Sequence, residues 1–383
     1  MKNILHVTLA VAMSLSLAAC SDNPNYTPDI PLPEPEPEPI AVELSGSIDK
    51  GALKFATVLI YRASDFDFES PLLTVPADVQ TDENGDYSAT VVNNANQAIR
   101  GVLVVRVTAD ADTVMVCDAP VSCGDTPRGQ DIPSDQLDGL SLKTLTQSTT
   151  DADGNGLPIS ADVNAITTLA TDVVIAQVKI IPDLDIDNLA SDGVVALQKN
   201  ASAVVGQILG VDLSETNIYK IKISDATDTQ AMDTAATEAG DDAVNTNTLT
   251  LINASFADLP VQEDPDEPSQ NLNFGNTLNS FIDNVKVITT IVVEAVSKQE
   301  NVTNALAAVD AGVRQIVADT QQKVADNTTQ LKQIINTEAE EKDLELNIDV
   351  PDLPTVVDDT TIGEVELEDV PDDVVVTGGT GAT

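Results

Sequence analysis

Residues 46–61 read GSIDKGALKFATVLIY, and residues 81–91 read TDENGDYSATV. In both stretches β-branched and aromatic residues form short runs, which the turn-forming groups DKGA and DENG interrupt. Such runs, separated by Gly and Asx residues, are typical of short strands joined by tight turns. Similar runs, AVELSGSI before and RGVLVVRVTA after, continue the pattern. We therefore predict an antiparallel β-sandwich of about seven strands over residues 41–148.

The order of these motifs resembles that of the carboxypeptidase regulatory-like (transthyretin-like) domains of secreted bacterial proteins. In that family a Gly-containing first strand leads to an A-T-V strand and later to a T-D-x-x-G-x-Y hairpin. The matching positions are Gly46, Ala56, Thr57, Val58, Thr81, Asp82, Gly85 and Tyr87. The resemblance covers less than a third of the chain. It implies a β-sandwich, in a family that includes both carbohydrate-binding-like and purely structural modules.

The N-terminus has the features of an export leader. Lys2 precedes a mostly apolar stretch over residues 4–17, and the sequence LAAC ends at Cys20. This stretch is too short and wrongly flanked for a transmembrane helix, which favours a secretory signal over residues 1–19. LAAC resembles the lipobox of bacterial lipoproteins, which implies acylation of Cys20 and the lipid bilayer as its partner. In such lipoproteins an Asp directly after the cysteine favours retention in the inner membrane. Here Ser21 follows the cysteine. The resemblance therefore implies lipid anchoring in the outer membrane, on its periplasmic or surface side.

Residues 20–40 connect the acylated cysteine to the first predicted strand. They include PLPEPEPEP, in which proline occupies nearly every second position. Proline fixes φ and favours an extended polyproline-type chain, and repulsion between the glutamates stiffens it. We predict a tether that holds the folded part away from the bilayer.

The charge of the chain excludes several kinds of function. The formal net charge is −45, and loss of Lys2 with the leader makes it −46 and removes the one histidine. A mature chain without histidine has no His-based acid–base catalysis, no Ser-His or Cys-His nucleophilic pair, and no His-bound metal or haem. Such an acidic surface also repels nucleic acid. Carboxylate-pair catalysis needs no histidine, so a carboxylate enzyme is the last-ranked alternative. We expect no enzyme and no nucleic-acid partner.

Two cysteines lie close together in VMVCDAPVSCG, at Cys117 and Cys123. An exported protein is found where disulfides form, and two thiols without a nearby histidine make a poor zinc site. The spacing favours a Cys117–Cys123 disulfide, with a thiol metal site as the alternative.

The stretch DADGNGLPISAD, over residues 151–162, has the spacing of a calcium loop. Oxygen-bearing residues fall at loop positions 1, 3, 5, 7 and 12, with glycine at position 6. The candidate ligands are Asp151, Asp153, Asn155, the carbonyl of Leu157, and Asp162. Asp at position 12 is shorter than the usual Glu, and no helical pattern precedes the loop. A hydrogen-bonded turn that caps the following helix is the favoured alternative.

The best local support for a ligand site is SDFDFES, in which Phe66 and Phe68 share one face between acidic residues. Exposed rings of this kind can bind a saccharide. Saccharide binding is the alternative function that analogy with the sandwich family suggests. Anchoring of a half-buried strand or loop is the favoured interpretation. The leading function is therefore a structural or interaction lipoprotein without catalysis, with a cell-envelope protein or a polysaccharide as its partner.

We predict a helical region over residues 149–261, which starts with the loop at 151–162. Helical periodicity begins after this loop. One helix is expected to end near Pro182, a second spans Val194 to Leu209 with Gly210 as its C-terminal stop, and a third lies around residues 229–259. Residues 262–274 read as a linker.

The remaining sequence predicts a long helical hairpin over residues 275–337, with helices over residues 275–298 and 302–335 and Asn301 as a candidate cap. Apolar residues alternate four and three apart at Val302, Leu306, Val309, Val313 and Ile316. This seam favours packing within the hairpin over packing against another chain. Residues 338–383 carry fifteen acidic residues against one lysine, which predicts a disordered acidic tail. The whole is an α+β multidomain chain.

Overall fold

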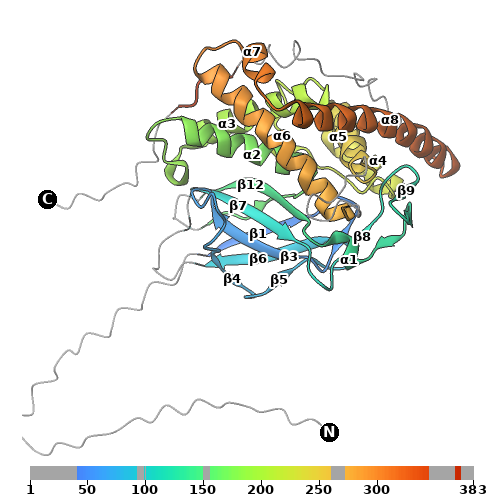
Figure 1. Cartoon of the computed structure of the whole chain (residues 1–383). Coiled ribbons are helices and arrows are strands. Elements are labelled where there is room, and N and C mark those ends of the chain that lie inside the picture. The colour runs from blue at the N-terminus through green and yellow to red at the C-terminus, as the bar shows by residue number, and fades with distance from the viewer. Residues whose placement is uncertain are drawn as a thin grey trace, which may run out of the picture. The chain divides into compact units, whose positions relative to one another are not determined.

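Within the described residues the strands form two four-stranded sheets and two smaller ones, and helices follow them (Figure 1). The computed structural model describes residues 41–92, 99, 101–149, 156–259, 272–344 and 367–371. All of these belong to the unit Pro39–Thr383, and the unit Met1–Glu38 lies outside the described residues. A sheet-rich N-terminal region thus precedes a helical C-terminal region, which confirms the predicted α+β class.

The first sheet has the strand order β13-β1-β6-β4. Its strands are β1 (Val42–Ser47), β4 (Leu73–Val75), β6 (Asp86–Val92) and β13 (Ile159–Ser160). β1 runs antiparallel to β6, with Leu44 opposite Ala89, and parallel to β13, with Leu44 opposite Ile159. β13 lies in the region predicted to be helical, residues 149–261, so this strand and its parallel pairing correct that prediction. The pairing arises because the segment after Gly156 runs beside β1 in the same direction before it enters the first long helix.

The second sheet has the order β12-β7-β3-β5 and is antiparallel throughout. Its strands are β3 (Thr57–Arg62), β5 (Val79–Gln80), β7 (Gly101–Thr108) and β12 (Ser141–Ser148). The smaller sheets contain β2 (Leu53–Lys54), β8 (Val114–Val116) and β11 (Asp131–Ile132), and the pair β9 (Ser122–Cys123) and β10 (Thr126–Pro127).

The burial of the strands shows which faces are covered. β1 alternates buried and exposed residues, because one face of its sheet is covered and the other meets solvent. β7 is buried at nearly every position, as expected for a strand covered on both faces. The second cover comes from a helix that packs on β12 (Figure 1).

The helical region follows the strands. Its α-helices are α2 (Ala165–Ile180), α3 (Ser191–Leu209), α4 (Thr229–Ala239), α5 (Ala243–Ser255), α6 (Phe274–Ser297), α7 (Val302–Ala307) and α8 (Ala311–Glu341), and α1 (Ser134–Leu137) lies earlier, before β12. Short 3-10 turns cover Ile186–Asn188, Ile218–Lys220 and Gly240–Asp242. α2 is the helix that packs on β12, and it also packs against α3 and α6.

Capping residues explain where the helices begin and end. Asn164 starts α2 with a capping box, in which its side chain accepts from the backbone of Thr167 and that threonine hydroxyl bonds back. Gly210 ends α3 in the left-handed conformation at φ 74°, where the sequence places the stop. Asn301 caps α7 by accepting from the backbone N–H of Asn304, as its candidate role predicts.

Two predicted helices are divided in the structure. The helix expected around residues 229–259 is α4 and α5, because Gly240 adopts φ 56° and a short 3-10 turn follows. The helix expected over residues 302–335 is α7 and α8, because α7 ends at Ala307 and Asp310 caps a new helix through the backbone N–H of Gly312. Caps in mid-segment outweigh the continuous apolar pattern here.

One hydrophobic cluster includes buried residues from both four-stranded sheets and from α2, α3 and α6. The regions predicted as sandwich and helices therefore share a core. A smaller cluster joins α4, α5 and α8, and includes Met232, Leu251, Leu331 and Ile335.

The predicted tail, residues 338–383, needs correction in two places. α8 runs on to Glu341, which is past the predicted start of the tail. Residues 367–371 lie against α3, where Asn200 donates to the Glu368 carbonyl at 3.0 Å and accepts from its N–H at 2.7 Å. Leu367 and Val370 pack on the core beside this contact. Apolar side chains and a paired backbone thus hold a segment whose charge alone predicted disorder.

Candidate functional site

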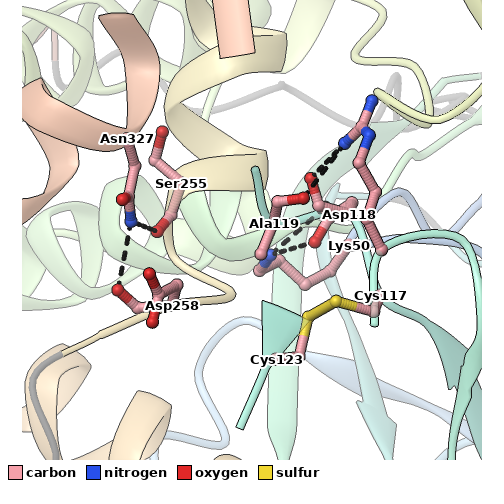
Figure 2. Close-up of a disulfide and its surroundings, with 9 residues drawn as sticks. Lys50, Cys117, Asp118, Ala119, Cys123, Ser255, Asp258 and Asn327 are labelled. Atoms are coloured by element: carbon pink, nitrogen blue, oxygen red, sulfur yellow. Dashed lines mark hydrogen bonds and ion pairs between the residues drawn. A yellow bond between two sulfur atoms is a disulfide. The ribbon is translucent and has the colours of Figure 1, made fainter. Parts of the chain in front are cut away.

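The most unusual group of side chains is a buried lysine–aspartate pair. Lys50 is 0 % exposed and Asp118 is 1 % exposed. Lys50 Nζ lies 3.0 Å from Oδ1 and 3.2 Å from Oδ2 of Asp118, so it faces both carboxyl oxygens (Figure 2). A buried charge is costly unless it is paired, and here each charge has its partner inside the core.

Two strands bring these residues together. Lys50 lies in the turn between β1 and β2, and Asp118 lies two residues after the end of β8. β2 pairs with β8, with Leu53 opposite Met115. Gly51 makes the turn possible, because it adopts φ 54° and a Cβ there would lie 1.9 Å from the carbonyl oxygen of Val116. The DKGA turn, predicted only as a connection, thus delivers a lysine into the core.

The disulfide adjoins the pair. Cys117 and Cys123 are bonded, with an S–S distance of 2.12 Å and a Cα–Cα distance of 5.7 Å (Figure 2). Both cysteines are buried. Asp118 directly follows Cys117, so the disulfide closes the short loop in which the buried carboxylate lies.

Arg128 holds the backbone around Asp118. Its guanidinium donates to the carbonyls of Asp118 at 2.8 Å and Ala119 at 3.2 Å, and to the carbonyl of Ala226 at 2.5 Å. The arginine therefore joins the disulfide loop to the segment before α4. Asp225, next to Ala226 in that segment, is a further carboxylate whose charge acts on both members of the pair.

Burial changes the protonation equilibria of the pair. Burial lowers the pKa of Lys50, against the opposing effect of the Asp118 carboxylate. Burial also raises the pKa of Asp118 to about 6, against the opposing charge of Lys50. Both changes favour the uncharged forms, a free amine beside a carboxylic acid.

A second carboxylate with a raised pKa lies beside Lys50. Burial raises the pKa of Asp49 to about 7, and the charges of Asp162, Asp225 and Asp86 act in the same direction, while the hydrogen bond from Ser47 opposes them. The hydroxyl of Ser47 donates to Asp49 at 2.5 Å, and the Ser47 N–H donates to Asp162 at 3.0 Å. These carboxylates line the end of β1.

A second group of charges joins three elements. Asp172 of α2 is 2 % exposed and lies 2.8 Å from Lys143 of β12 and 3.6 Å from Lys286 of α6. This group ties a strand to two helices, and its position between them suits a structural role.

The two candidate ligand-binding rings are half-buried. The Phe66 ring lies under Lys179, at 5.0 Å. The Phe68 ring makes an edge contact with Tyr61 at 5.3 Å, and Arg106 lies 5.5 Å from its centroid. The chain itself therefore contacts these rings, as an anchored loop requires. Saccharide binding through Phe66 and Phe68 stays a prediction.

Two of the five candidate calcium ligands lie in the described part of the chain. The Leu157 side chain is exposed, and Asp162 accepts hydrogen bonds from Ser47. Asp151, Asp153 and Asn155 lie outside the described residues. Among the residues that the structure does describe, no three His, Cys, Asp or Glu side chains are placed to hold a metal ion. Calcium binding stays a prediction.

Sequence reasoning missed the Lys50–Asp118 pair because its members lie 68 positions apart in the sequence. One signal was present. Lys50 stands between two apolar residues that are buried, Ile48 and Leu53, in a chain with few basic residues. Cys20 and the leader lie outside the described residues, and in the described part no helix combines the length and apolarity needed to cross a membrane.

Comparison of the chain with protein-family models, with curated proteins and with solved structures finds no match.

Proposed function

We propose that this chain is a lipid-anchored structural or interaction protein of the bacterial outer membrane, without catalytic activity. The sequence LAAC supports acylation of Cys20. One acyl chain binds a membrane only weakly, and stable anchoring needs two such chains or a chain with a second membrane-binding feature. Several acyl chains on one cysteine meet this requirement, since each buried methylene contributes about 0.8 kcal/mol. The Pro/Glu-rich residues that follow would hold the folded part away from the bilayer.

The observation that carries the proposal is the position of β1. The strand begins at Val42, three residues after the last proline of the tether, Pro39. β1 is an inner strand, bonded to β6 on one edge and to β13 on the other. Any load on the anchor therefore enters the folded unit through a strand that is hydrogen-bonded on both sides. Such an attachment suits a protein that holds or links other components.

The buried charges support a structural role as well. The Lys50–Asp118 pair and the group around Asp172 connect elements that lie far apart in the sequence. The aspartate side chain is buried in both. We further propose that the two four-stranded sheets are the layers of a carboxypeptidase regulatory-like β-sandwich. The support is the motif order and a single hydrophobic cluster to which strands of both sheets contribute buried residues.

Membrane fractionation tests the anchor. We expect the Cys20→Ala variant to lose fatty-acid labelling and to leave the outer-membrane fraction, because it lacks the acceptor thiol. Ser21→Ala, one residue away, is the matched control and should stay labelled and membrane-bound. Ser21→Asp should move the protein to the inner membrane. Unchanged fractionation and labelling of Cys20→Ala would refute the proposed anchor.

A further inference from the structure

We propose that Lys50 and Asp118 condense into an intramolecular amide bond, which covalently joins the turn after β1 to the loop after β8. The bond would be a modification of the folded chain by its own side chains. It does not depend on lipid anchoring, and its test is separate.

The geometry of the pair places the reacting atoms together. Lys50 Nζ lies 3.0 Å and 3.2 Å from the two carboxyl oxygens of Asp118. Cγ lies between those oxygens, so the nitrogen is close to the near-attack separation of about 3–3.5 Å. Well-oriented intramolecular reactions at such separations reach effective concentrations on the order of 10⁵–10⁸ M. No mobile partner has to be captured.

The surroundings hold both residues in place. Gly51 fits the turn against the carbonyl of Val116, and the Cys117–Cys123 disulfide closes the loop next to Asp118. The Arg128 guanidinium donates a hydrogen bond of 2.8 Å to the backbone carbonyl of Asp118. The side chains are 0 % and 1 % exposed, so bulk water does not compete with the amine. The site therefore resembles a preorganised reaction site more than a surface ion pair.

The reaction needs a free amine and a carboxylic acid, and one proton transfer along the existing hydrogen bond converts the ion pair into these forms. Burial lowers the pKa of Lys50 and raises that of Asp118, and both changes favour the uncharged forms. The nitrogen lone pair then attacks Cγ and forms the N–C bond. A C–O bond breaks, and the departing hydroxyl takes a proton from the nitrogen and leaves as water. Nothing is oxidised or reduced, and no co-reactant is required.

The product also removes an unfavourable feature of the core. Two buried charges carry a desolvation penalty that their mutual attraction offsets only in part. The amide is uncharged, and the reverse reaction requires water to return to a closed site. Condensation is therefore more favourable in this core than it is in water.

Peptide mapping of the purified full-length protein tests the proposal. Trypsin cuts after lysine and arginine but not after an acylated lysine. After reduction and alkylation, we expect a branched peptide in which residues 107–128 are joined through uncleaved Lys50 to the peptide that ends at Lys54. Its mass should be lower than the sum of the two peptides by one water molecule. A linear peptide of residues 107–128 together with cleavage after Lys50 would overturn the proposal.

The chain contains its own matched control. Lys54 and Asp131 form an ion pair with an N–O distance of 2.9 Å, but their side chains are 21 % and 51 % exposed. This solvated pair should remain unlinked in the same digest. The Asp118→Ala variant should lose the branched peptide, and its persistence there would show that Lys50 is linked elsewhere. The wild-type map decides the question even if that variant does not fold.

Discussion

At the scale of single residues, burial decides which charges matter. The chain has 63 acidic residues, and those with an evident structural role are held by burial or by a hydrogen bond, as Asp118, Asp162 and Asp172 are. Lys50 and Asp118 neutralise each other in the core. Asp49, beside Lys50, accepts a hydrogen bond from Ser47, and burial raises its pKa to about 7.

The raised pKa of Asp49 predicts how stability changes with pH. Between about pH 4 and pH 7 the unfolded chain loses this proton while the folded chain keeps it, so the free energy of unfolding falls as pH rises. Asp49→Asn removes this effect and still accepts from Ser47. We expect the variant to be more stable than the wild type by about 1–3 kcal/mol at pH 8 and equally stable at pH 4.

Urea unfolding of both proteins at the two pH values measures this difference. Asp212→Asn is the control, because hydrogen bonds from Ser214 lower the pKa of Asp212 and its effect has the opposite sign. An Asp49→Asn variant that is less stable than the wild type at pH 8 would show that the folded protein needs the charge.

At the scale of elements, α8 shows how a polar helix is held in place. Its predicted apolar seam weakens at Thr320 and Asn327, but both residues are buried. The Asn327 amide donates to the carbonyls of Ser255 at 3.2 Å and Asp258 at 3.1 Å (Figure 2). Polar side chains thus join α8 to the end of α5, and apolar contacts resume at Leu331.

The packing of Leu331 predicts a strong effect of truncation. Leu331 is fully buried in the small cluster that joins α8 to α4 and α5. Because the cavity left by Leu331→Ala cannot collapse completely, we expect the free energy of unfolding to fall by about 2–5 kcal/mol. The neighbouring exposed residue provides the control, and Gln330→Ala should change stability by less than about 0.5 kcal/mol. Equal effects of the two variants in denaturant titrations would mean that α8 does not pack here.

At the scale of the whole molecule, the excess of acid dominates. A formal charge of −45 produces self-repulsion, which ions screen. Any salt should therefore stabilise the fold, and a specific site would appear only as a difference between ions of equal charge.

That difference tests the calcium loop. We expect millimolar Ca²⁺ to raise the melting temperature more than Mg²⁺ at equal ionic strength, because flexible oxygen sites of low affinity, about 10⁻⁴–10⁻³ M, favour the larger ion. Replacing Asp151 and Asp153 by Asn should abolish the difference, which differential scanning calorimetry can measure. Identical effects of the two ions on the wild type would leave the loop as a turn.

The sequence by itself determined the local features of this protein. Alternating or β-branched runs located β1, β3, β6 and β7, and Gly210 marked the end of α3. These features follow from neighbours within a few residues, namely side-chain periodicity and capping. The short spacing of Cys117 and Cys123 belongs to the same class, since they lie six positions apart in the sequence.

Only the tertiary structure decided which distant segments meet. It paired Ile159 with β1, brought Asp118 to Lys50, and placed Glu368 against Asn200. None of these contacts has a local signature, because each depends on how complete elements pack around a shared core. A lysine in a DKGA turn looks like a solvated surface residue in sequence, and only the burial of both strands around it makes the residue a partner for a carboxylate.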